Sequence, residues 1–92
     1  MRQYAVDYGD QGIRSNAVNA DRIRSGLLTA ELVAKRARAR RIREADYMTD
    51  NLLHKEVRAG DVARAFINLA KSDRTTGAIM TVDGGNIAAA LR

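Results

Sequence analysis

The stretch GIRSNAVNADRIRSGL, residues 12–27, decides the fold. Its first half holds Ile13, Ala17 and Val18, an apolar run typical of a short β-strand. Polar residues follow this run, and helix-forming sequence follows the polar residues. In open α/β sheets, ligands bind at loops that leave the carboxyl ends of strands. The stretch therefore predicts a strand over residues 13–19 followed by a candidate ligand-binding loop.

A second strand signal is AIMTV, residues 78–82, which ends sharply at Asp83-Gly84-Gly85. Only helix-forming sequence separates the two strand signals, with helices predicted over residues 28–42, 44–53 and 61–71 and the second strand over 78–83. This order predicts an α/β fold in which two parallel strands are joined by a right-handed helical crossover. Two parallel strands leave faces and edges uncovered, so we expect oligomer contacts or further strands to complete the sheet.

Charge is concentrated in one segment of this 92-residue chain, which carries 16 Lys and Arg against 11 Asp and Glu. Six basic residues fall close together: Lys35, Arg36, Arg38, Arg40, Arg41 and Arg43. On a helix they would surround most of the circumference, and neither stacking aromatics nor a known docking motif accompanies them. This pattern favours a solvated, ion-paired or partner-facing helix. Salt-dependent binding of nucleic acid is the less favoured alternative.

Several functional classes lack their usual sequence signals. Cysteine is absent, no apolar run has the length of a membrane span, and no signal peptide follows Met1. We therefore expect a cytoplasmic protein without a membrane partner. His54 has no metal-ligating residues at ligand spacing, so no metal site is expected. No complete catalytic constellation is present, and no tyrosine precedes a lysine by four residues.

The loop over residues 20–26 is the best candidate site. Its backbone N–H groups, the Ser25 hydroxyl and the start of the next helix suit a polar or anionic ligand. Arg22 and Arg24 would add positive charge. An ordinary connecting loop explains the same residues, and spacing alone does not decide between the two readings. Thr29 is the expected N-cap of the helix that follows.

Three segments resemble one family in order. GIRSNAVN (residues 12–19), DVARAF (61–66) and TTGAIMTVDGG (75–85) resemble the sixth strand, a later helix and the last strand of short-chain dehydrogenases/reductases. The resemblance covers essentially the whole chain and corresponds to the C-terminal third of the family's domain. It implies a partial Rossmann fold in which the two strands are neighbours at one edge of the sheet.

A closer resemblance rests on NADRIRSGLLT (residues 19–29), ADYMTDNLL (45–53) and GGNIAAALR (84–92). These segments are similar to the dehydrogenase half of bifunctional rhamnulose-1-phosphate aldolase/alcohol dehydrogenases. The similarity implies oxidation of lactaldehyde by NAD.

The family resemblance also implies the cofactor site, made by Asn19, Ala20, Asp21, Ile23 and Ser25. The family's Pro-Gly pair aligns with Ala20-Asp21, so Asp21 is expected to take the left-handed conformation that glycine takes in relatives. The backbone of Ile23 would meet the nicotinamide carboxamide, and Ser25 stands where relatives have threonine. Residues 27–53 would form the lid over the substrate.

The resemblance places the family's glycine-rich loop, ribose-binding acid and catalytic serine, tyrosine and lysine in segments before the matched third. We therefore expect a fragment or a truncated product that is inactive by itself, and the resemblance implies NAD as a cofactor of the full-length domain rather than of this chain alone. In relatives, the last helix and last strand commonly form subunit contacts. A homo-oligomer, or an assembly module without catalysis, is therefore the alternative function.

Overall fold

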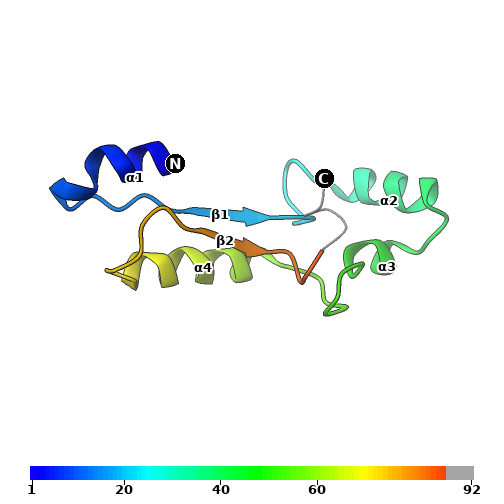
Figure 1. Ribbon diagram of the computed structural model, residues 1–92. Helices are drawn as coiled ribbons and strands as arrows, with labels where there is room; N and C mark the ends of the chain where they lie inside the picture. The colour runs from blue at the N-terminus through cyan, green and yellow to red at the C-terminus, as the bar shows by residue number, and fades with distance from the viewer. Residues whose placement is uncertain (87–92) are drawn as a thin grey trace.

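The computed structural model describes residues 1–86, so the end of the segment GGNIAAALR (84–92) lies outside the described part. Figure 1 shows an elongated α/β arrangement. Its elements in chain order are α1 (Arg2–Tyr8), a 3-10 turn (Gly9–Gln11), β1 (Ala17–Ala20), α2 (Ala30–Ala39), α3 (Glu44–Met48), α4 (Ala59–Lys71) and β2 (Ile79–Val82).

The two strands pair in parallel, with Ala17 opposite Ile79 and Ala20 opposite Val82. The predicted α/β fold and parallel pairing are therefore confirmed. In Figure 1, α4 lies along the strands, whereas α2 and α3 lie beyond their carboxyl ends. The loop after β1 thus faces a small helical subdomain made of α2 and α3.

Strand β1 begins four residues later than predicted and includes Ala20, which was expected in the loop. Ahead of it, one backbone bond, from the Gly77 N–H to the Ser15 carbonyl at 2.8 Å, is accompanied by hydrogen bonds of side chains. The Asn16 side chain donates to the Thr75 carbonyl and accepts from the Ala78 N–H, both at 3.0 Å. The Ser15 N–H donates to the Thr76 hydroxyl at 3.0 Å. These hydrogen bonds hold the residues just before β1 beside the segment that precedes β2, although they are not part of the strand itself.

Helix α2 is shorter than the predicted 28–42, and both of its ends have identifiable causes. Thr29 is the N-cap, as predicted, and its hydroxyl accepts from the Leu32 N–H at 3.3 Å. The helix ends because Arg41 takes a left-handed conformation with φ 57°. The Ile42 N–H then donates to the Ala37 carbonyl at 3.0 Å, which closes a Schellman-type end on an arginine in place of the usual glycine.

Helix α3 stops at Met48, although the sequence predicted helix through residue 53. Beyond it the chain pairs with the turn after β2, where Leu52 and Leu53 donate to the Gly85 and Gly84 carbonyls at 3.2 and 3.0 Å. Gly84 and Gly85 both have positive φ, as the predicted sharp stop requires. These tertiary bonds compete with further helical turns.

Helix α4 begins two residues before the predicted 61. The Asp61 carboxylate accepts from the Arg58 backbone N–H at 2.8 Å, and this hydrogen bond is the main cause that lowers the pKa of Asp61. Ala65 and Leu69 are buried, but Phe66 is 57% exposed, because only one side of α4 meets the sheet.

The buried residues form two sets. Five of them cluster between α2 and α3 and just before α2: Leu28, Val33, Ala37, Tyr47 and Met48. The others, Val57, Ala65 and Leu69, lie outside this cluster, on α4 and just before it. The radius of gyration is 16.0 Å, whereas a compact chain of this length has about 12 Å. The accessible surface of 6871 Å² exceeds the compact expectation of about 5,300 Å² by about 1,600 Å².

No helix within residues 1–86 is both long enough and apolar enough to cross a bilayer.

Candidate functional site

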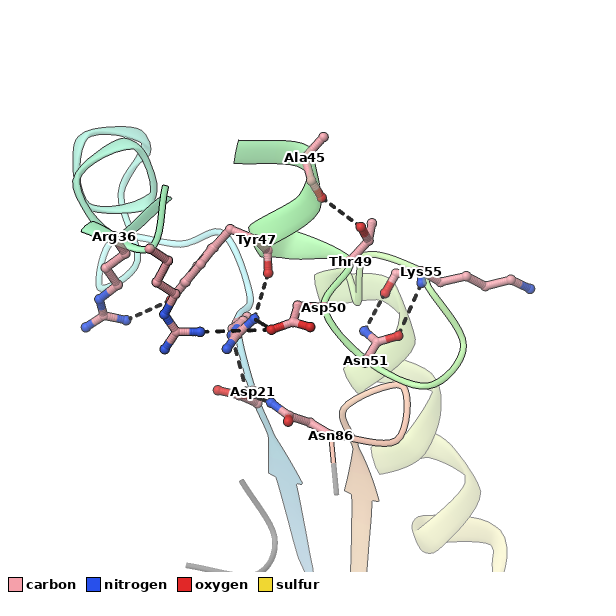
Figure 2. A network of polar contacts seen from close by, with 11 residues as sticks. Asp21, Arg36, Ala45, Tyr47, Thr49, Asp50, Asn51, Lys55 and Asn86 are labelled. Carbon is pink, nitrogen blue, oxygen red and sulfur yellow. Dashed lines mark hydrogen bonds and ion pairs between the residues drawn. The ribbon is translucent and has the colours of Figure 1, made fainter. Parts of the chain in front are cut away.

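The loop after β1 turns at Arg22, which has a left-handed φ of 52°. The expectation that Asp21 takes this conformation is therefore wrong. The reason lies in the contacts of the two side chains. Asp21 points to the turn after β2, where its carboxylate accepts from the Asn86 amide at 2.7 Å (Figure 2). Arg22 turns the other way, toward α3.

A hollow of about 330 Å³ lies beside this loop, and we call it the β1–α2 hollow. Its loop wall consists of Ala20, Asp21, Arg22, Ile23 and Ser25. Its opposite wall, which we call the helical wall, consists of Leu27 and Leu28 just before α2 and of Leu32 and Arg36 within α2. Four of the five predicted cofactor residues therefore line one concavity, and Asn19 is the exception. Its size lies at the small end of the roughly 300–1,000 Å³ typical of ligand pockets.

Ser25 and Ile23 provide polar groups that suit a carboxamide or a phosphate. The Ser25 hydroxyl oxygen accepts from the N–H groups of Leu27 and Leu28 at 3.1 and 3.2 Å. This arrangement leaves its O–H proton to donate to an acceptor on a ligand. Within residues 1–86 the Ile23 backbone makes no intramolecular hydrogen bond. This wall therefore offers a hydroxyl donor and an unbonded backbone amide to a polar ligand.

Arg22 fastens the loop to the helical subdomain. Its guanidinium donates to the Tyr47 carbonyl at 2.7 Å and lies over the Tyr47 ring, 4.4 Å from the ring centre. Asp50 accepts from the same guanidinium at 3.4 Å. The Arg22 side chain is only 12% exposed, so these contacts are largely shielded from water. We call this set of contacts the Arg22 clamp.

The Arg22 clamp includes a second guanidinium. Arg40 lies 5.3 Å from the centre of the Tyr47 ring and 4.0 Å from Asp50. Figure 2 shows the Tyr47 side chain between α2 and the loop after β1, and Asp50 at the end of the dashed lines from two guanidinium groups. The clamp fixes how far the helical subdomain lies from the loop, and it thereby sets the width of the β1–α2 hollow.

The prediction that Arg22 and Arg24 supply positive charge to the site is wrong in part. Arg24 forms an ion pair with Glu56 at 3.1 Å and does not line the hollow. Arg22 lines it, but its guanidinium is held by the clamp. The charged residue that sequence reasoning missed is Arg36. A usable signal was its position one helical turn after Leu32, which places both side chains on the same face of α2.

The rest of the basic run is partly ion-paired. Arg43 and Asp46 are joined by two hydrogen bonds, of 2.8 and 3.1 Å, and the hydrogen bond from Arg43 is the main cause that lowers the pKa of Asp46. Lys35 and Arg38 are exposed and make no ion pair within residues 1–86. The run therefore does not form one uniform basic face. Nucleic-acid binding stays an untested alternative.

A parallel strand pair joined by a helical crossover, with a hollow at the carboxyl end of its first strand, is typical of doubly wound α/β folds. The family whose description is enoyl-(acyl carrier protein) reductase matches residues 1–86. The chain therefore belongs to the short-chain dehydrogenase/reductase family. No curated protein matches it.

Proposed function

We propose that this chain is the part of an NAD-dependent short-chain dehydrogenase that holds the nicotinamide half of the cofactor and covers the substrate. The observation that carries the proposal is the β1–α2 hollow, whose loop wall contains Ala20, Asp21, Ile23 and Ser25. Asn19 would act from the end of β1. The family typically uses NAD or NADP, which agrees with a site of this kind.

Each group in the loop wall has a binding role in this proposal. The Ile23 backbone would pair with the carboxamide, and the Ser25 hydroxyl would donate to a cofactor oxygen. Asp21 would keep the loop against the turn after β2 through its hydrogen bond from Asn86. When bound, NAD supplies hydride acceptance. The residues of this chain would bind, orient and shield it.

The proposal gives α2 and α3 the role of the lid. Two apolar side chains, those of Leu28 just before α2 and of Leu32 within it, line the hollow on this side. The Arg22 clamp would hold the lid against the loop after β1. No proton-transfer role is assigned to this chain, because no tyrosine stands four residues before a lysine in residues 1–92. Lactaldehyde, implied by the closer resemblance, is the first substrate to test.

The two halves of the cofactor provide the test. The isotope-labelled chain is titrated with nicotinamide mononucleotide and separately with AMP, and amide shifts are followed by NMR. The mononucleotide is expected to shift Ile23 and Ser25, whereas AMP, the half with no site proposed here, is expected to leave them unchanged. Ser25→Ala should weaken mononucleotide binding. Equal shifts with both nucleotides would contradict the proposal.

A second candidate function is an assembly module, which the open surface favours. A stable interface takes roughly 800 Å² from each partner, and the chain exposes about 1,600 Å² beyond the compact expectation. Phe66, Ile67 and Ile79 are each at least half exposed. Sedimentation at increasing concentration is expected to show a dimer that Phe66→Glu dissociates. A monomer at all concentrations would rule this function out.

A further inference from the structure

The charged groups that line the β1–α2 hollow do not contribute equally to its net charge. Asp21 accepts from Asn86 and lies 3.8 Å from the Arg22 guanidinium. Arg22 in turn is held by the Tyr47 carbonyl and by Asp50. These opposite charges offset one another within the wall. The remaining charged group of the lining is Arg36, so the hollow has a net positive character.

Arg36 is positioned to use that charge on a ligand. Within residues 1–86 its guanidinium makes one hydrogen bond, a long one of 3.4 Å to the Tyr47 hydroxyl. A guanidinium has five N–H donors, so most remain for an acceptor. Leu32 lies one helical turn before it and lines the same wall. The hollow therefore combines an aliphatic surface with a cationic rim.

We propose that Arg36 selects a substrate that carries an anionic group, a carboxylate or a phosphate monoester, at the end of a short aliphatic chain. This inference rests on the proposed function, because it assumes that the loop wall holds the cofactor and leaves the helical wall to the substrate. Lactaldehyde is neutral and lacks such a group, so this inference favours an anionic substrate over it.

The physical basis is the pairing of a planar guanidinium with an oxyanion. Arginine binds carboxylate and phosphate through two parallel hydrogen bonds, which also fix the orientation of the anion. The aliphatic chain would then lie on Leu28 and Leu32, where burial favours it. A neutral amide of the same shape would lose the charge-assisted bonds while keeping the apolar contact.

The test compares three probes on the full chain by NMR titration: butyrate, butyl phosphate and butyramide. The two anions are expected to bind about tenfold more tightly than butyramide, as loss of a charge-assisted hydrogen bond implies. Whichever anion binds more tightly identifies the substrate group as carboxylate or phosphate. Arg36→Gln is expected to abolish this preference, and Arg36→Lys to retain part of it.

Arg38→Gln is the matched control, because Arg38 lies on the same helix, is exposed and does not line the hollow. It removes the same unit of charge. If Arg38→Gln weakens anion binding as much as Arg36→Gln, the effect is general electrostatics and the inference is wrong. Equal binding of butyrate, butyl phosphate and butyramide would also overturn it.

Nicotinamide mononucleotide separates this inference from the proposed function. Arg36→Gln is expected to leave the binding of nicotinamide mononucleotide unchanged. In the unsubstituted chain, the mononucleotide and the anionic probe should bind at the same time. If it binds but displaces the anion, Arg36 serves the cofactor phosphate, and the substrate assignment fails while the proposed function stands. If the anion binds but the mononucleotide does not, the proposed function fails and the substrate assignment fails with it.

Discussion

The Arg22 clamp can be separated into a backbone contribution and a side-chain contribution by two substitutions at one position. Arg22 has a left-handed φ of 52°, which favours glycine over residues with a Cβ. Its side chain is nearly buried and contacts Tyr47 and Asp50. Arg22→Ala removes the side chain and keeps the backbone cost. Arg22→Gly removes the side chain and relieves that cost.

The magnitudes follow from the contacts. A hydrogen bond from a charged donor contributes about 2 kcal/mol, and a cation–π contact about 1 kcal/mol. The bond to Asp50, a carboxylate that is 62% exposed, adds little. Arg22→Ala should therefore lower the free energy of unfolding by about 3 kcal/mol. Arg22→Gly should recover about 1 kcal/mol of that loss, because the left-handed conformation no longer costs energy.

Urea unfolding, followed by circular dichroism, measures both variants against Arg24→Ala. Arg24 is 47% exposed and has one ion pair, with Glu56, so its removal should cost about 0.5 kcal/mol. If Arg22→Ala costs no more than Arg24→Ala, the clamp does not hold the loop. If Arg22→Gly is less stable than Arg22→Ala, the argument from the backbone conformation is refuted.

Three further predictions concern the elements around the site. Gly84→Ala should lower the free energy of unfolding by about 2 kcal/mol or more, because φ at Gly84 is 68° and an added Cβ would lie 2.5 Å from the Asn51 side chain. Gly60 has open space around it and an ordinary φ, so Gly60→Ala should raise the free energy of unfolding by about 0.5 kcal/mol in the same urea assay. Thr29→Ala should cost about 1 kcal/mol through loss of the α2 N-cap, again by urea unfolding; no change would show that the cap is dispensable. The pKa of Asp61 is lower in the folded than in the unfolded chain. The contribution of the Asp61 carboxylate to stability is therefore fully present above its ordinary pKa near 4 and is lost as pH falls through the lowered value. Urea unfolding at neutral pH and near pH 3 should show that Asp61→Asn removes this part of the loss of stability in acid.

The sequence predicted features that depend on local chemistry. The strand at Ile79–Val82 and the cap at Thr29 follow from propensity and hydrogen bonding among near neighbours. The sharp stop at Gly84 and Gly85 follows from the freedom of glycine to take positive φ. The parallel order of the strands followed from the helical sequence between them. The resemblance placed the candidate loop correctly at the carboxyl end of the first strand.

The features that sequence reasoning missed depend on distant residues. The helix end at Arg41 has no local signal, because arginine rarely takes a left-handed conformation. The Arg22 clamp joins residues 25 positions apart, from Arg22 to Tyr47. The late start of β1 depends on bonds from Asn16 to residues about sixty positions away. No local sequence pattern identifies these distant partners, so they could not be predicted from the residues nearby.

The proposed binding of the nicotinamide end of the cofactor in the β1–α2 hollow can be tested with intermolecular nuclear Overhauser effects between nicotinamide mononucleotide and the methyl-labelled chain. We expect effects from the nicotinamide ring protons to the methyl groups of Ile23 and Leu28, which line this hollow. Effects confined to Leu52 and Leu53, which line a separate hollow beside the turn after β2, would show that the nicotinamide binds elsewhere.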